Sequence, residues 1–172
     1  MTELDLAYIA GLIDGEGYIG ITRVLATGGY GMKSPRYKAR FQIRMVDKTI
    51  IEYLADCFGG KAHAYNSASA KGRPMFYFHA SDVMLDRLLA QVMPYLRIKK
   101  PQVIAVQEFR LWQTKERSYR TKVVGSRQMT NPHGTLINIR TMAHSDEYIA
   151  ECERFYLLCQ GMNYSHVVTP IL

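Results

Sequence analysis

Two carboxylates separated by one glycine carry the sharpest chemical signal in this sequence of 172 residues. Asp14 and Glu16 belong to the segment Ile9-Ala-Gly-Leu-Ile-Asp-Gly-Glu-Gly17. The apolar residues of this segment recur at helical spacing and Gly15 with Gly17 stops the run, so we expect both acids to lie just past the end of a helix. Because a helix dipole disfavours negative charge at its C-terminus, a bound cation would offset the cost of two carboxylates there. The pair therefore indicates either a divalent metal site or an ordinary helix stop with solvated acids, and composition alone favours the helix stop.

Positive charge gathers on one side of a predicted strand. Residues 37–45 alternate between apolar and polar side chains, and the window 17–46 contains no acid. Like charges two residues apart on a strand repel unless an anion lies against them, and Arg, Lys and Gln match the edges of guanine and adenine. A solvated face would carry mixed signs, so the pattern favours contact with nucleic acid. The polar residues of this strand are Lys38, Arg40, Gln42 and Arg44.

A second strand pair, at 61–65 and 75–79, repeats the pattern more weakly. Its outward residues mix hydrogen-bond donors with aromatic rings, so base contact and packing against a neighbour explain them equally well. These residues are Lys61, His63, Tyr65, Arg73, Met75, Tyr77 and His79.

The elements that must position these residues follow from periodicity and from helix caps. The expected order is a helix capped by Thr2, strands at 18–24 and 37–45, a helix at 47–58, the strand pair, a helix begun by Ser81, a helix at 101–112 and a last helix at 145–158. Residues 115–140 show no period and are interpreted as a basic loop. The sequence predicts one α+β domain across 1–172.

The segment 9–17 resembles the LAGLIDADG motif of homing endonucleases. Six of its nine positions are identical, namely Ala10, Gly11, Leu12, Ile13, Asp14 and Gly17. The predicted element order of residues 1–113 is also similar to the core of that family, whereas residues 114–172 do not align. The resemblance implies an αββαββα core with a four-stranded antiparallel saddle sheet in each subunit, here followed by a basic loop and an extra C-terminal helix.

The resemblance also implies a metal site. The last acid of the motif binds the catalytic divalent metals in this family, which assigns that role to Glu16, with the Gly15 carbonyl as a helper and Asp14 in a structural role. Mg²⁺ is the expected ion, with Mn²⁺ as a substitute, because hard cations prefer carboxylate and water oxygens.

Two further catalytic positions are implied by the resemblance. Asp47 follows the strongest strand, where the family places a polar residue that organises water, although Asp47 could also cap the following helix. Lys99 matches the active-site lysine of the family, with Lys100 as the alternative if the alignment slips by one residue.

A single copy of the motif implies a homodimer, because the family takes one acid from each of two packed helices. Ala10 and Gly11 are small enough for those helices to approach closely. Twofold symmetry implies a near-palindromic double-stranded DNA target. The residues expected to contact this DNA are Arg23, Lys38, Arg40, Gln42, Arg44, Lys48, Lys61, His63, Tyr65, Arg73 and Tyr77.

The function implied is a site-specific double-strand DNA endonuclease of the homing type. The alternative is a protein of the same scaffold that binds without cutting, either an RNA maturase that assists intron splicing or a DNA-binding protein. Glu16 and Lys99 favour the enzyme, since binding alone would not require them. The basic segment around Lys122 and Arg127 could clamp phosphates or be solvated, which keeps the binding alternative open.

Composition indicates an intracellular protein, in the cytoplasm, at the nucleoid or in an organelle. The three cysteines show no paired spacing, and the N-terminal residues include acids where a signal peptide carries basic residues. No apolar run approaches the roughly 18 residues that a membrane span needs. The formal net charge of +7 favours a polyanionic partner rather than a membrane-spanning role.

Overall fold

A computed structural model describes residues 1–25, 33–65, 74–116, 121–130 and 134–164. The elements, in chain order, are α1 (Glu3–Glu16), β1 (Gly17–Val24), β2 (Arg36–Met45), α2 (Lys48–Phe58), β3 (His63–Tyr65), β4 (Met75–Ala80), α3 (Asp82–Val92), α4 (Lys100–Lys115), β5 (Thr121–Thr130), β6 (Leu136–His144) and α5 (Asp146–Tyr164). The first seven elements follow the predicted αββαββα order.

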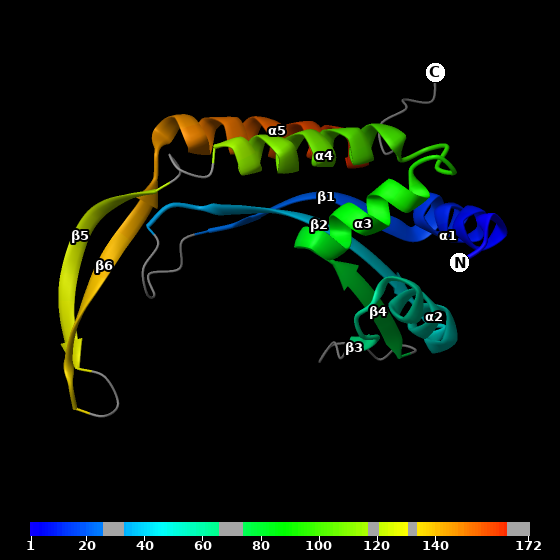
Figure 1. Ribbon diagram of the computed structural model, residues 1–172, viewed down its shortest axis with the longest axis horizontal. Coiled ribbons are helices and arrows are strands. Elements are labelled where there is room, and N and C mark those ends of the chain that lie inside the picture. The colour runs from blue at the N-terminus through cyan, green and yellow to red at the C-terminus, as the bar shows by residue number, and fades with distance from the viewer. Residues whose placement is uncertain (26–32, 66–73, 117–120, 131–133, 165–172) are drawn as a thin grey trace, which may run out of the picture.

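The first four strands form one antiparallel sheet in the order β1-β2-β4-β3. The predicted alternation of β2 is confirmed: Tyr37, Ala39, Phe41 and Ile43 are buried, and the side chains between them lie on the opposite face. Helices α4 and α5 form a layer over one side of the sheet, and α1 and α3 lie at one end of it (Figure 1). The other face of the sheet is not covered by α4 and α5 (Figure 1).

Helix α1 begins with a capping box, in which the Thr2 Oγ1 accepts the Asp5 N–H at 3.2 Å and the Asp5 carboxylate accepts the Thr2 N–H at 2.7 Å. The helix continues through Glu16, so both acids of the motif lie in its last turn. The expectation that they lie past the helix end is therefore wrong. It continues directly into β1 at Gly17, where a Cβ would lie 2.8 Å from the Ile13 carbonyl oxygen and 3.1 Å from the Phe41 ring. Only glycine fits this junction.

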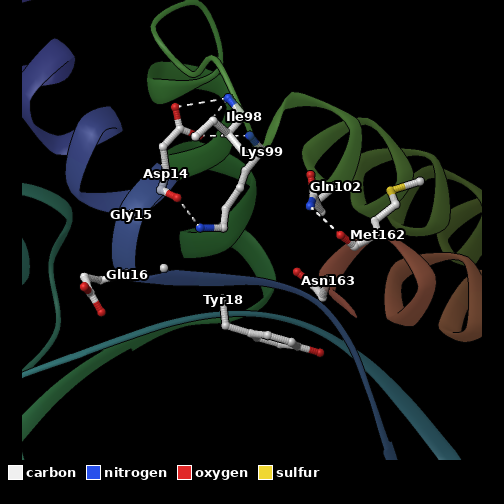
Figure 2. A pocket seen from close by; sticks show the side chains of 10 residues that line it. Asp14, Gly15, Glu16, Tyr18, Ile98, Lys99, Gln102, Met162 and Asn163 are labelled. Carbon is white, nitrogen blue, oxygen red and sulfur yellow. Dashed lines mark hydrogen bonds between the residues drawn. The ribbon is translucent and has the colours of Figure 1, made fainter. Parts of the chain in front are cut away.

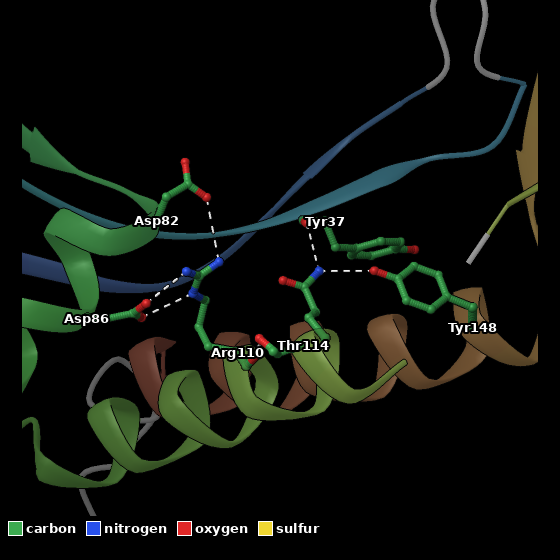
Figure 3. Close-up of polar contacts among 7 residues, drawn as sticks. Tyr37, Asp82, Asp86, Arg110, Thr114 and Tyr148 are labelled. Carbon is green, nitrogen blue, oxygen red and sulfur yellow. Dashed lines mark hydrogen bonds and ion pairs between the residues drawn. The ribbon is translucent and has the colours of Figure 1, made fainter. Parts of the chain in front are cut away.

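Polar contacts attach α4 to the rest of the core (Figure 3). The Arg110 guanidinium donates to both Asp86 oxygens, at 3.1 and 2.8 Å, and lies 3.5 Å from an Asp82 oxygen. The Gln113 side chain donates to the Tyr37 carbonyl at 3.4 Å. Helix α4 is thereby tied to α3 and to β2, which sets the position of its N-terminal end beside α1.

The segment after α4 differs from the predicted basic loop. Residues 121–130 and 136–144 pair as an antiparallel hairpin, β5–β6, with a register shift between Val123 and Gly125. Helix α5 also continues past the expected end at Leu158 and includes Gly161. Among the described residues, no helix combines the length and the apolar character needed to cross a bilayer.

Candidate active site and nucleic-acid interface

A cavity of about 460 Å³ lies where α1 meets β1, beside the start of α4 and the end of α5 (Figure 2). It contains two residues that the sequence assigned to the active site, Glu16 and Lys99, although they lie far apart in the chain. The lining residues are Asp14, Gly15, Glu16, Gly17, Tyr18, Ile98, Lys99, Gln102, Met162 and Asn163.

The Asp14 carboxylate is occupied by backbone hydrogen bonds. It accepts the N–H groups of Arg97 at 2.7 Å, Ile98 at 3.2 Å and Lys99 at 2.9 Å, which join the end of α1 to the segment before α4. Partial burial raises the pKa of Asp14, but these N–H bonds and the Lys99 charge outweigh it and hold the pKa below its ordinary value. Asp14 is a structural clamp, in agreement with the role the motif implied.

Lys99 is bound to the C-terminal end of α1. Its Nζ donates to the carbonyl oxygens of Ile13 at 2.8 Å and Asp14 at 2.5 Å. Burial lowers the pKa of Lys99, while the nearby carboxylates of Asp14 and Glu16 act in the opposite direction. Lys100 is exposed as the first residue of α4 and lines no described cavity, so of the two candidates it is Lys99 that lies beside the acids of α1.

Glu16 is exposed, and within the described ranges its carboxylate forms no hydrogen bond or ion pair. Besides the first cavity, it lines a second one of about 490 Å³ with Tyr18, Gln42, Arg44 and Met75. Figure 2 shows its side chain directed away from that of Lys99. Glu16 therefore lies between the lysine cavity and the exposed face of the sheet.

Three other predicted residues have partners within the chain. Asp47 caps α2 by accepting the N–H groups of Thr49 and Ile50, and it lines neither cavity. Lys48 forms an ion pair with Glu52 at 2.5 Å in the same helix. Arg23 forms an ion pair with Glu153 of α5 at 2.8 Å, on the helical side of the sheet.

The exposed sheet face brings together the central polar residues of β2 and their neighbours on β1, β3 and β4. Gln42 lies opposite Tyr18 and His79, and Arg44 lies opposite Tyr77. The rings of His63, Tyr77 and His79 stack with centroid separations of 5.0 to 6.0 Å.

This face also has unused hydrogen-bonding capacity. The Arg40 Nε and the His79 Nδ1 are enclosed but have no partner among the described residues. Burial, then the charges of Arg40 and His63, lower the pKa of His79 and favour its neutral form. The Arg44 guanidinium lies 4.9 Å from the centre of the Tyr65 ring. Lys61 is exposed just before β3, and Arg73 lies outside the described residues.

Sequence reasoning missed several residues of the site. Tyr18 could have been found, because it alternates onto the exposed face of β1, whereas His79 was already among the outward residues of the second strand pair. Gln102 and Asn163 carried no signal. Gln102 is only 4% exposed, its Nε2 donates to the Met162 carbonyl at 3.4 Å, and its Oε1 has no partner among the described residues. The Asn163 Nδ2 donates to the Ile19 carbonyl at 3.0 Å.

The expected dimer contact is corrected at one position. Ala10 is 0% exposed and packs inside the core of its own chain, so it is unavailable to a second copy. Gly11 is exposed with open space above it. Leu4 and Tyr8, which precede Gly11 at helical spacing, are 82% and 50% exposed. The open face of α1 is thus formed by Leu4, Tyr8 and Gly11.

Comparison with known proteins places this geometry in context. Neither protein families nor curated proteins give a match by sequence. Among solved structures, the homing endonuclease I-CvuI, in complex with its target, is 22% identical with a TM-score of 0.53, over 67% of this chain and 72% of that one. The archaeal intron-encoded homing endonuclease I-Vdi141I, complexed with DNA, is 18% identical with a TM-score of 0.53, over 66% and 70%.

A third similar structure is the LAGLIDADG homing endonuclease I-GzeII in complex with its DNA target. It is 17% identical with a TM-score of 0.51, and the match covers 66% of this chain but only 38% of that one. The chain therefore has the fold of the LAGLIDADG homing endonucleases.

Proposed function

We propose that this chain is a site-specific, divalent-metal-dependent DNA endonuclease of the homing type that acts as a homodimer. The observation that carries the proposal is the position of Glu16. Its exposed carboxylate lies between a cavity that holds Lys99 and a sheet face lined by Gln42 and Arg44. A duplex bound on that face would bring its phosphates close to the carboxylate.

The residues at the end of α1 fit a hard divalent cation. Glu16 supplies an exposed carboxylate and Gly15 an adjacent carbonyl, which are the oxygen donors that Mg²⁺ prefers. Such an ion supplies an activated water and neutralises charge on the phosphate. Structures of the similar enzyme I-CvuI were obtained in the presence of Ca and of Mg, the latter with DNA that is not cleaved. Mg²⁺ is our choice, with Mn²⁺ as a substitute.

Lys99 supplies a second positive charge. Its Nζ is held by two carbonyl oxygens, and its backbone N–H is fixed by Asp14, so the ammonium needs little reorganisation when a phosphate arrives. Partial burial strengthens its interaction with a phosphate oxygen. Asp47 is assigned to capping α2, with any contribution to water structure secondary to that role.

Three observations support the homodimer. Asp14, the other acid that lines the cavity of Glu16, is taken up by backbone N–H groups, so a second free acid would come from a second chain. The open face of α1 is apolar at Leu4 and Tyr8 and lacks a side chain at Gly11, which suits close helix contact. The match to only 38% of I-GzeII, against 72% of I-CvuI, is the relation expected of a chain that contributes half a site.

The proposed DNA-contact surface comprises the exposed face of the sheet. Two copies related by a twofold axis would read a near-palindromic target in the major groove. Arg23 and Lys48 are left out of base reading because their charges are used by Glu153 and Glu52. The contact residues are Lys38, Arg40, Gln42, Arg44, His63, Tyr65, Tyr77 and His79, with Lys61 and Arg73 as further candidates.

The test is a cleavage selection from a randomised near-palindromic duplex library in Mg²⁺, with Ca²⁺ in a parallel reaction. Recovery of one cut sequence is expected with the native chain. Glu16→Gln should abolish cutting of that sequence and preserve binding, whereas the matched control Glu108→Gln, at an exposed position of α4, should change neither. Specific binding without cutting in Mg²⁺ or Mn²⁺ would refute the enzyme and favour the maturase or DNA-binding alternative.

A further inference from the structure

The β5–β6 hairpin is not explained by the core or by the proposed active site. Its strands pair with each other over residues 121–130 and 136–144 and join no other sheet among the described strands. The described side chains between Val123 and Asn138 are exposed. A two-stranded ribbon alone is marginally stable in water, so a ribbon of this length is expected to lie against another molecule.

The root of the hairpin is anchored. The His144 N–H donates to the Oγ of buried Ser34 at 2.8 Å, just before β2 begins. The His144 ring lies 4.7 Å from that of Tyr148 at the start of α5, and Tyr148 stacks on Trp112 of α4 at 5.0 Å. These contacts fix the base of the ribbon and thereby its direction.

That direction leads away from the helical layer. Figure 1 shows β5–β6 leaving the end of the sheet opposite α1 and turning toward the side not covered by α4 and α5. The strand of ten residues spans about 30 Å at roughly 3.3 Å per residue. A duplex lying on the exposed sheet face would thus meet the ribbon at the end of the half-site farthest from Glu16.

The positive charge of residues 117–145 favours a polyanion as the partner of the hairpin. Residues 117–145 contain five Arg or Lys residues and no acid, and three of these lie in the strands: Lys122, Arg127 and Arg140. Neutral polar residues accompany them, with Gln128 paired across the ribbon to Asn138. A second copy of this chain, at a formal charge of +7, lacks the excess of negative charge that would attract the ribbon.

We propose that the β5–β6 hairpin is a DNA-binding arm that contacts phosphates at the outer end of each half-site. The proposal rests on the proposed function, because it requires DNA on the sheet face. It adds a contact that raises affinity without reading bases, since phosphate contacts position a protein on the duplex and base contacts specify the sequence.

The test compares two double variants that each remove two positive charges per chain by the same chemistry. The arm variant carries Arg127→Gln and Arg140→Gln. The control variant carries Arg87→Gln and Arg154→Gln, which lie on helices α3 and α5. Affinity for the selected duplex and for an unrelated 40-base-pair duplex is measured from about 50 to 300 mM salt. Hydroxyl-radical footprints are recorded on the selected duplex. Circular dichroism and thermal melts confirm that both variants fold, and Lys122→Gln replaces the arm variant if it does not.

The arm variant should lower the slope of log affinity against log salt by about 0.9 for each phosphate that the arm no longer neutralises, and therefore by up to about 3.6 in a dimer. It should remove protection at the outer ends of the footprint while the centre remains protected, and the duplex should still be cut at the same bond. The control variant should leave the slope and the footprint unchanged.

Equal slopes and equal footprints for the two variants would overturn the arm while leaving the endonuclease intact. Dissociation of the dimer in sedimentation without DNA, with the footprint unchanged, would also overturn it and assign the ribbon to the second copy. Failure of the native chain to bind either duplex would instead refute the proposed function. The two failures are thereby distinguished.

Discussion

Replacing Asp14 by Asn should destabilise the protein, although both side chains have the same shape. The carboxylate accepts backbone N–H groups from Arg97, Ile98 and Lys99 with its two oxygens. Asn keeps one acceptor oxygen and turns an NH₂ donor toward the remaining N–H groups. At least one backbone donor then faces another donor, and the negative charge that strengthened all three bonds is removed.

The magnitude follows from these contacts. A hydrogen bond to a charged group contributes about 1.5–3 kcal/mol, and the partial exposure of Asp14 places the expected loss near the lower part of that range, at about 2 kcal/mol. For a chain of 172 residues each kcal/mol shifts Tm by about 2–4 °C, so Tm should fall by about 4–8 °C. Urea denaturation at pH 7, followed by circular dichroism, measures the change in unfolding free energy.

The pH dependence provides a second readout. Because the pKa of Asp14 is below its ordinary value of 3.8 in the folded state, its stabilising contribution is complete above pH 3.8. It is lost as the pH falls through the lowered folded value, where the native carboxylate also becomes protonated. The difference in stability between the native chain and Asp14→Asn should therefore be constant from about pH 7 to about pH 5 and shrink below pH 3.8.

The control is Asp56→Asn, an exposed carboxylate in α2, which should change stability by less than about 0.5 kcal/mol. If Asp14→Asn costs no more than this control, the backbone clamp contributes nothing and our account of the α1–α4 junction is refuted.

Three further predictions concern other parts of the chain. Gly17→Ala should lower the free energy of unfolding by about 1–3 kcal/mol in urea denaturation, because its Cβ would lie 2.8 Å from the Ile13 carbonyl oxygen. The control Gly161→Ala, in helix α5 with open space around it, should be neutral or stabilising. Equal effects of the two variants would contradict this reasoning. Lys99→Met should reduce the cleavage rate at least about tenfold with target affinity nearly unchanged, while Lys100→Met should cut normally; the reverse result would reassign the lysine. In the native protein a thiol reagent at about pH 8 should modify only Cys57, which is half-buried. The other two cysteines are buried, and burial raises the pKa of the Cys159 thiol to about 11. More than one reactive thiol per folded chain would disprove this.

Much of the core could be predicted from the sequence because its elements are locally encoded. The alternation of β2 has a buried face and an exposed face, so period two is visible in the residues themselves. The Thr2 cap and the glycine at position 17 mark the two ends of α1 within the chain. The motif in α1 then indicated the fold, which the solved structures confirm.

The β5–β6 hairpin could not be predicted, because it lacks the buried face that makes the strands of the core visible in the sequence. A ribbon that packs against no core has no face to bury, and so nothing requires its apolar and polar residues to alternate. Helix α5 passes through Gly161 because packing of α5 against the sheet and α4 outweighs the small helix penalty of one glycine.

The sequence by itself determined which residues are candidates for the chemistry: the acid at position 16, the basic strand face and a lysine near position 99. Only the tertiary structure decided which of them meet. Lys99 reaches α1 because Asp14 accepts hydrogen bonds from the backbone that precedes α4. Asp47 instead caps helix α2, and Arg23 forms an ion pair with Glu153. The identity of a side chain is given at its own position in the sequence. Which side chains contact each other depends on elements far apart in the chain, and those contacts form only when the core packs.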